Sequence, residues 1–184
     1  NIPYLKEEKE YFKKFVYNKN ALVDTINVGK NIVVKKKSNA TILFDMTYHT
    51  TGYPELTFRN GAGSKIKITY SEALFKKINE NEKVTDGNLL FVDLKGNRND
   101  CTNKEIFGYY DILFPEGKNE SITFKPFGKR TFRFVQLDIQ TKDDELIIED
   151  FYNVYTGYPY KQVAEFKTND ALLNKIWDVS WLTI

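Results

Sequence analysis

Short segments with strand periodicity, separated by turn residues, most constrain how this chain can fold. In residues 65–70, Ile66, Ile68 and Tyr70 alternate with polar residues, which places the two sets on opposite faces of a β-strand. Similar strand segments are predicted at residues 41–44, 108–114, 121–125, 131–140 and 145–155. No helical periodicity interrupts them, so the central part of the chain is predicted to be all-β.

Two local patterns indicate how these strands are arranged. The turn residues at 60–63 (Asn-Gly-Ala-Gly) predict a hairpin in which residues 55–58 pair with residues 65–70. In residues 131–139 the apolar phase changes at Phe134, which predicts either a β-bulge there or burial on both faces. Strands covered on both faces without helices favour an antiparallel β-sandwich.

The two ends of the chain differ from its centre. The spacing of Tyr11, Phe12, Phe15 and Val16 predicts one or two turns of helix within residues 7–20. Residues 169–184 carry an apolar face of helical spacing, and Thr168 or Asn169 is predicted to cap that helix. The apolar face consists of Leu172, Leu173, Ile176, Trp177, Ser180 and Trp181.

The chain is therefore divided into three predicted segments. Residues 1–38 are a lead-in that packs on the sandwich, residues 39–165 form the sandwich, and residues 166–184 begin a linker helix. Because the helix has no Gly, Pro or basic residue near its end, we expect it to lead into a further domain. The tetrapeptide Thr-Gly-Tyr-Pro occurs at residues 51–54 and 156–159, and both copies are predicted to begin or end strands.

Composition excludes several classes of function. Lys and Arg number 27 against 25 Asp and Glu, a net charge of +2, which does not favour a nucleic-acid partner. No apolar run reaches the roughly 20 residues needed to span a bilayer. Cys101 and His49 are the single residues of their types, so an intramolecular disulfide, a Cys-rich zinc site and every multi-His metal motif are excluded.

Catalytic residues are not evident. Glycoside hydrolysis needs two carboxylates at a set separation, but solvated strand ends explain the acidic residues better. The acids considered are Glu55, Glu72, Asp45, Asp93, Asp100 and Asp111. His49 is the sole imidazole base, and no Gly-x-Ser-x-Gly motif is present.

Two segments are candidates for sugar binding. Residues 93–100 combine amide, carboxylate and guanidinium groups, which can bind sugar hydroxyls or simply cap turns. Residues 48–55 offer tyrosine rings as flat faces for a saccharide. No cofactor is predicted; calcium is a minor alternative for the first segment, whose spacing differs from that of an EF-hand. The candidate substrate-binding residues are Tyr48, His49, Tyr53, Glu55, Asn97, Arg98 and Asp100.

The order of several motifs resembles the β-sandwich domain of bacterial alpha-L-rhamnosidases, over roughly residues 40–184. An aspartate at Asp45 precedes a glycine-tyrosine strand, a Gly-x-Gly turn and a Tyr-x-Glu-Ala-Leu strand end. Further matches are Lys-Gly-Asn-Arg, Gly-Tyr-Tyr-Asp, Phe-Lys-Pro and a Phe-Arg-Phe strand in which Phe134 replaces the usual tyrosine. These motifs lie at residues 51–56, 61–68, 70–74, 95–98, 108–111, 124–126 and 130–135. The segment from Phe166 to Trp177 resembles the junction with the helical catalytic barrel.

This resemblance implies a fold and a function. The fold is an antiparallel β-sandwich of the jelly-roll or concanavalin-like type, followed by an (α/α)6 barrel that begins near Trp177. Such enzymes release terminal L-rhamnose with inversion, and the barrel supplies the acid and the base, so no catalytic residue carries over to this chain. Periplasmic or secreted localisation is also implied.

The chain is therefore expected to be a non-catalytic module of a rhamnosidase-like glycoside hydrolase. It would contact the C-terminal helical catalytic domain of the same chain and shape the sugar site, with a glycan as a second partner. Two alternatives stay open: an autonomous, lectin-like carbohydrate-binding module, and a protein-interaction domain.

Overall fold

The computed structural model describes residues 2–23, 31–76 and 94–182 of the 184 residues. The chain forms two compact units: Lys6–Gly157 is the larger, and Asn1–Leu5 together with Tyr158–Ile184 is the smaller. The large unit contains all the strands, and the small unit contains the helix α2. The strands are β1 (Lys6–Tyr11), β2 (Lys14–Lys19), β3 (Leu22–Val23), β4 (Ile32–Val34), β5 (Asn39–Asn60), β6 (Lys65–Ser71), β7 (Leu74–Lys76), β8 (Lys104–Ile106), β9 (Tyr110–Leu113), β10 (Ile122–Phe124), β11 (Arg130–Gln140) and β12 (Leu146–Gly157).

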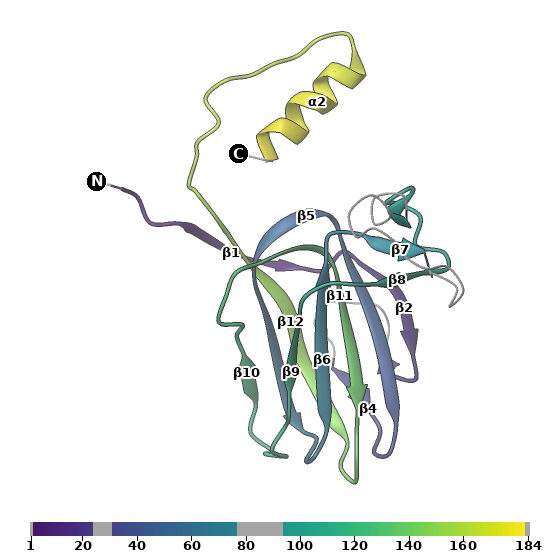
Figure 1. Ribbon diagram of the computed structural model, residues 1–184. Helices are drawn as coiled ribbons and strands as arrows, with labels where there is room; N and C mark the ends of the chain where they lie inside the picture. Colours follow the sequence, from purple (N-terminus) through teal and green to yellow (C-terminus); the bar gives the residue numbers. More distant parts are fainter. Residues whose placement is uncertain (1, 24–30, 77–93, 183–184) are drawn as a thin grey trace. The chain divides into compact units, whose positions relative to one another are not determined.

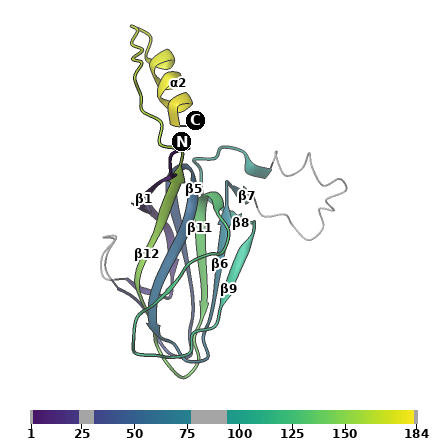
Figure 2. The ribbon, with the colours of Figure 1, turned by 90° about the vertical axis from the view of Figure 1, so that its left-hand side faces the viewer.

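The large unit is an antiparallel β-sandwich whose two layers share one long strand, β5 (Figures 1 and 2). Residues 39–45 of β5 pair with β11 and β2, and β6 and β9 continue this first layer. Residues 52–60 of β5 pair with β12 and, in part, with β10. Strands β1 and β4 pair with β12, and β3 with β4, to complete the second layer.

The transfer of β5 between layers takes place at residues 46–49. In the register with β11, Phe134 lies opposite Asp45 but Phe132 lies opposite Thr50, so four residues of β5 are left without a partner on β11. Thr47 adopts a left-handed backbone conformation with φ of 69°. The predicted β-bulge near Phe134 is confirmed, and it coincides with the point where β5 leaves the first layer.

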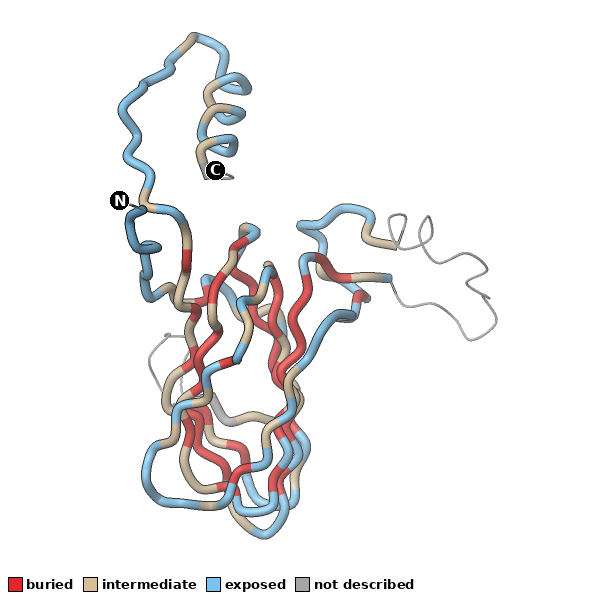
Figure 3. The backbone as a smooth tube through the Cα atoms, turned by 60° about the vertical axis from the view of Figure 1, so that its left-hand side comes forward, coloured by how far each residue is buried: buried red, intermediate tan, exposed pale blue. Residues whose placement is uncertain are grey.

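Apolar side chains from both layers fill the space between them, and buried residues follow the strands of each layer (Figure 3). Phe12 packs against Phe44 and Phe151, with ring centroids 5.0 and 4.7 Å apart. A second, smaller apolar cluster joins Leu43 and Phe134 to Leu74 of β7. It lies on the outer face of the first layer, where the paired strands β7 and β8 cover part of the sheet.

The predicted strands are confirmed, but one predicted pairing is wrong. Residues 65–70 do not pair with residues 55–58: β6 pairs with β11 and β9, in the other layer. The turn at 60–64 is present, with Ser64 N–H donating to the Gly61 carbonyl at 2.9 Å and left-handed φ at Gly61 and Gly63. This turn carries the chain from the second layer to the first. Residues 55–58, before the turn, pair within the second layer, and residues 65–70, after it, pair within the first.

The predicted helix within residues 7–20 is also wrong. The segment forms β1 in the second layer and β2 in the first. Phe12, between them, is buried in the core, and Lys13 N–H donates to the Asp45 carbonyl at 3.0 Å. The spacing of Tyr11, Phe12, Phe15 and Val16, which resembles a helical face, therefore comes from two strands joined by a short connection between the layers.

The two Thr-Gly-Tyr-Pro copies differ in position. The second copy is at the end of β12, as predicted, whereas the first lies in the middle of β5. Pro54 is tolerated there because the side of β5 that pairs with β11 and β10 has no strand partner between Gly52 and Leu56.

The C-terminal helix is confirmed as α2 (Ala171–Leu182). Its N-cap is Asp170, not Thr168 or Asn169: Asp170 Oδ1 accepts from the Leu172 N–H at 2.8 Å. Within this unit, Phe166 stacks on Trp177 with centroids 5.5 Å apart. No described helix is long and apolar enough to cross a membrane. The segment boundaries at residues 38 and 165 stay predictions.

Candidate functional site

The seven residues predicted to bind substrate lie in two separate regions. Asn97, Arg98 and Asp100 are in the exposed loop that precedes β8. Tyr48, His49, Tyr53 and Glu55 are on β5, at and after its transfer between layers. No hydrogen bond or ion pair links the two groups among the described residues.

The loop of residues 94–103 is fixed by two cations beneath it. Lys104, which is buried, donates from Nζ to the carbonyl oxygens of Lys95 at 2.7 Å and Asn97 at 2.6 Å. Arg133 donates from Nη1 to Asn99 Oδ1 at 2.9 Å. The loop is thus held in a defined conformation, although no sequence pattern indicated either anchor.

Within this loop, two of the predicted residues cap turns. Asn97 Oδ1 accepts from the Asn99 N–H at 3.0 Å, and Asp100 Oδ1 accepts from the Thr102 N–H at 2.9 Å. The second bond lowers the pKa of Asp100 below its ordinary value. The side chain of Arg98 is exposed to solvent. The turn-capping alternative for Asn97 and Asp100 is therefore realised.

The Asp45–Arg133 pair connects this loop to the transfer point of β5. Arg133 donates from Nε to Asp45 Oδ1 at 2.9 Å and from Nη2 to Oδ2 at 3.0 Å. The Thr47 N–H also donates to Asp45 Oδ1, at 2.7 Å. The hydrogen bonds to Asp45 raise the pKa of Arg133. Because the guanidinium binds both carboxylate oxygens, the pair fixes the geometry of the bend.

Tyr48 and Glu55 belong to hydrogen-bonded clusters of their own. The Tyr48 hydroxyl donates to Glu10 Oε1 at 2.9 Å, and its pKa is raised, first by burial and then by that bond. Glu55 is buried and accepts from the Tyr152 hydroxyl at 2.7 Å, while Lys125 Nζ lies 2.9 Å from its Oε1. The first cluster links β5 to β1, and the second links β5 to β12 and to Lys125, which follows β10.

His49 and Tyr53 have looser surroundings. His49 is exposed, and its Nε2 lies 3.6 Å from Glu72 Oε1. Tyr53 is partly exposed on β5. Neither side chain has the arrangement of base and nucleophile that covalent catalysis requires.

An aromatic groove lies beside Glu72, and we call it the Tyr109 groove. It encloses about 590 Å³, and Tyr109 and Tyr110 are 87% and 55% exposed. Arg130, in its wall, donates from Nη2 to both carboxylate oxygens of Asp111, at 2.9 and 3.0 Å. The groove is lined by Tyr70, Ser71, Glu72, Ala73, Phe75, Lys95, Phe107, Gly108, Tyr109, Tyr110, Lys129, Arg130 and Thr131.

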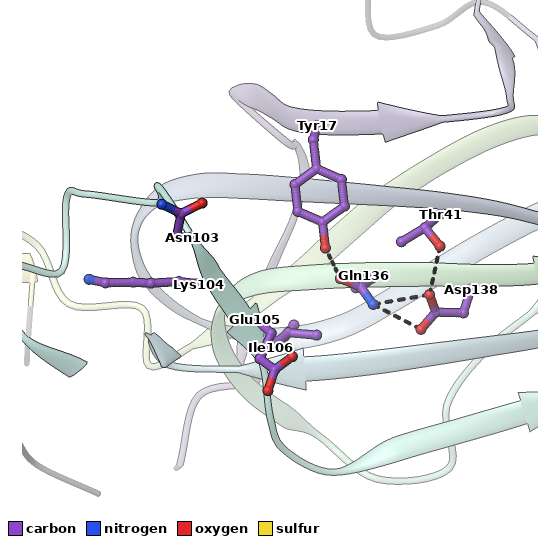
Figure 4. A pocket seen from close by; sticks show the side chains of 8 residues that line it. All are labelled: Tyr17, Thr41, Asn103, Lys104, Glu105, Ile106, Gln136 and Asp138. Carbon is purple, nitrogen blue, oxygen red and sulfur yellow. Dashed lines mark hydrogen bonds between the residues drawn. The ribbon is translucent and has the colours of Figure 1, made fainter. Parts of the chain in front are cut away.

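A second hollow, of about 460 Å³, lies on the outer face of the first layer (Figure 4). The Tyr17 hydroxyl donates to Gln136 Oε1 at 2.5 Å, and Gln136 Nε2 donates to both oxygens of Asp138 at 3.0 and 2.9 Å. Thr41 Oγ1 also donates to Asp138, at 3.0 Å. Burial, followed by the charges of Asp138 and Glu105, raises the pKa of Tyr17.

Sequence reasoning did not find this hollow. Its residues come from β2, β5, β8 and β11, and each one looks like an ordinary polar position of an exposed strand face. The alternation in residues 131–140 does place Gln136 and Asp138 on one face, but only the strand order brings Tyr17 and Thr41 beside them.

Metal binding gains no support from the described side chains. Across residues 2–23, 31–76 and 94–182, no three His, Cys, Asp or Glu residues are grouped so that they could hold an ion. The calcium alternative for the loop therefore stays an untested prediction.

The family comparison identifies most of the large unit. The sequence profile of the bacterial alpha-L-rhamnosidase concanavalin-like domain matches residues 35–172. No curated protein matches the chain by sequence.

Two solved structures share the fold. The GH78 family rhamnosidase of Bacillus sp. GL1 is 19% identical, with a TM-score of 0.53, over 82% of this chain and 13% of that one. The rhamnosidase from Klebsiella oxytoca with rhamnose bound is 16% identical, with a TM-score of 0.64, over 98% of this chain and 35% of that one. The chain thus spans about a third or less of these relatives, and the likeness shows the fold alone.

Proposed function

The chain belongs to the bacterial alpha-L-rhamnosidase family through its concanavalin-like domain, and we propose that it is a non-catalytic module of an enzyme acting on rhamnose-containing glycans. Its role is to support the catalytic domain of the same chain and to help shape the sugar site. The match to residues 35–172 supports the assignment as a module, because the described chain consists of this domain and a second, short unit.

The state of the buried carboxylates is the observation that carries the non-catalytic role. Asp45 and Glu55 are the buried carboxylates of the described chain, and each is held by a cation, Arg133 or Lys125. A catalytic carboxyl group must lie within hydrogen-bond reach of the substrate, whereas both of these carboxylates are buried and already bonded to neighbouring side chains. Both groups therefore suit strand-to-strand connection better than proton transfer.

A catalytic domain as partner is supported by the helix α2. Leu172, Leu173, Ile176 and Val179 are each between 44% and 65% exposed, although they are apolar. Such side chains gain free energy when a partner covers them. The solved relatives are longer, since this chain covers only 13% and 35% of them, and further chain of that kind is the partner proposed for the helix.

The direct test measures hydrolysis. Residues 1–184 are expected to release no p-nitrophenol from p-nitrophenyl α-L-rhamnopyranoside, whereas a longer protein that carries these residues and a helical catalytic domain does so. Activity of residues 1–184 alone would contradict the non-catalytic role.

Export to the periplasm or medium is part of the proposal and rests on the family resemblance. Cell fractionation tests it.

The exposed loop is proposed to border the sugar site. Arg98 carries its charge into solvent, where it can reach a bound saccharide. In the full-length enzyme, Arg98→Ala and Asn97→Ala should raise KM with little change in kcat. Unchanged kinetics would remove the loop from the sugar site without affecting the proposal for the module.

An autonomous carbohydrate-binding module is the second candidate. The observation that favours it is the presence of two hollows of about 460 and 590 Å³ with exposed tyrosines in their walls. Titration of residues 1–184 with L-rhamnose, followed by Tyr and Trp fluorescence, distinguishes the two. A response at millimolar sugar or below favours a binding module, and a flat titration favours a scaffold.

A further inference from the structure

We propose that the outer face of the first layer binds an uncharged oligosaccharide, which lies across the strands in a trough floored by Gln136 and Asp138. This inference deepens the proposed function, on which it rests, by naming a binding face and a ligand class. It is carried by strand register, by a connected hydrogen-bond network and by the charge of the lining side chains.

The strand register brings Tyr17 to Gln136. Tyr17 lies opposite Leu43, and Leu43 lies opposite Gln136. The lining residues of the trough run from Tyr17 on β2 across β5 and β11 to Lys67 on β6. These four strands span about 14 Å at three interstrand spacings. A trough of that length suits an oligosaccharide better than one monosaccharide.

The next row continues the trough. Thr41, Asp138 and Lys67 lie opposite one another on β5, β11 and β6. The hollow of Figure 4 and a neighbouring one of about 370 Å³ share Thr41 and Asp138, so they form one continuous depression. Strand β8 forms its wall through residues 103–106.

The network in the floor is already ordered for sugar hydroxyls. Gln136 is held between Tyr17 and Asp138, and Thr41 holds Asp138 from the other side. A carboxylate accepts several hydrogen bonds, so Asp138 retains lone pairs for hydroxyl donors. Because these side chains are fixed before binding, less conformational entropy is lost when the ligand binds.

A tyrosine ring forms one edge of the trough. Tyr17 is 38% exposed. A flat, partly exposed ring offers apolar contact to the C–H faces of sugars.

The charges in the trough favour a neutral ligand. Lys65 and Lys67 are matched by Asp138 and Glu105. Lys104 lines the wall, but its ammonium group binds backbone carbonyls of the preceding loop. The trough therefore has no surplus cation for a uronate or phosphate. The Tyr109 groove differs, since Lys95, Lys129 and Arg130 line it.

Calorimetric titration of residues 1–184 tests the proposal. The probes are tetrasaccharides of L-rhamnose, glucose (cellotetraose) and xylose, together with free L-rhamnose and tetragalacturonate. At least one neutral tetrasaccharide should bind ten-fold or more tightly than rhamnose. Gln136→Ala and Asp138→Asn should each weaken that binding at least ten-fold. Gln162→Ala, at an exposed glutamine outside the sandwich, and Tyr109→Ala, in the other groove, should leave it unchanged.

Several outcomes overturn the trough. These are no binding of any neutral tetrasaccharide, a preference for tetragalacturonate, or binding that is weakened by Tyr109→Ala but not by Gln136→Ala. If the Gln136 variant does not fold, Tyr17→Ala decides in its place. The hydrolysis assay is independent: activity of residues 1–184 would overturn the non-catalytic module, whereas failure of binding alone overturns only the trough.

Discussion

At the scale of single residues, Arg133 joins three parts of the sandwich. It sits at the β-bulge of β11, binds the buried Asp45 of β5 through two nitrogens, and donates to Asn99 in the exposed loop. Its side chain is 14% exposed and that of Asp45 is 4% exposed. Because both side chains are largely buried, removal of either Arg133 or Asp45 leaves the charge of the other buried without a counter-charge.

Replacement of Arg133 by Ala is expected to reduce the free energy of unfolding by about 3–5 kcal/mol, measured by urea denaturation. Arg98→Ala is the matched control. Because Arg98 is exposed, its loss should change stability by no more than about 0.5 kcal/mol. Equal effects of the two substitutions would show that the Asp45 ion pair does not hold the bend.

Sequence reasoning reached some of these residues but not their roles. It singled out Asp45, through the resemblance, and the bulge near Phe134, yet it did not connect them, because the residues are 88 positions apart. Asn97 and Asp100 were identified as polar, and the structure adds that they cap turns of a loop fixed by Lys104.

At the scale of elements, β5 determines the architecture because it belongs to both layers. Its second half lies close to β12, and Gly52 is the position of closest approach. A Cβ at Gly52 would overlap the Asn153 side chain and the Val154 carbonyl oxygen. The Thr-Gly-Tyr-Pro segment is thus constrained by packing against β12, and not by a strand end.

Gly52→Ala is expected to destabilise the sandwich by about 1–3 kcal/mol, because the backbone of β12 must move to admit a methyl group. The change would be seen as a lower Tm in a thermal melt. Gly128→Ala is the control, since its Cβ would meet only the flexible end of the Arg130 side chain. A Tm loss for Gly128→Ala as large as that for Gly52→Ala would refute this account.

The helix α2 offers a test of the partner proposal. Because its apolar side chains are exposed, residues 1–184 in isolation should self-associate at high concentration, as judged by sedimentation velocity. Ile176→Glu should abolish the association. Val163→Glu, at a valine that is 93% exposed outside the helix, should leave it intact. If unsubstituted residues 1–184 stay monomeric at all concentrations, the apolar side chains of α2 do not mediate association.

At the scale of the whole molecule, the raised pKa values of three tyrosines make the free energy of unfolding depend on pH in the alkaline range. Burial raises the pKa of Tyr70 and Tyr48, and burial with the Glu55 bond raises the pKa of Tyr152 to about 12. In the unfolded chain a tyrosine loses its proton near pH 10. The folded state therefore retains protons that the unfolded state has lost, so this stabilisation is complete below about pH 10 and is lost above it.

We expect the free energy of unfolding to fall between about pH 10 and pH 12, measured by urea denaturation at a series of pH values. Tyr70→Phe should reduce the slope of that fall, since it removes one of the groups. It should cost little at neutral pH because the Tyr70 hydroxyl has no hydrogen-bond partner among the described residues. An unchanged alkaline slope in this variant would contradict the assignment.

The sequence by itself determined the strands β5, β6 and β9 to β12 and the terminal helix, because each depends on the periodicity of neighbouring side chains. It determined the turn at residues 60–64 through its glycines. The strands β1 and β2 were not predicted, because their aromatic spacing also suits a helix, and the phase change at Phe134 left a bulge and burial on both faces as alternatives. The sequence also indicated the family, through the order of short motifs. The tertiary structure alone decided which strands pair. Alternation specifies which face of a strand is buried but not its neighbour, since backbone hydrogen bonds are the same for every residue type. The observed pairing places β6 in the first layer, apart from residues 52–60 of β5, and brings Tyr17 to Gln136 across 119 residues of chain.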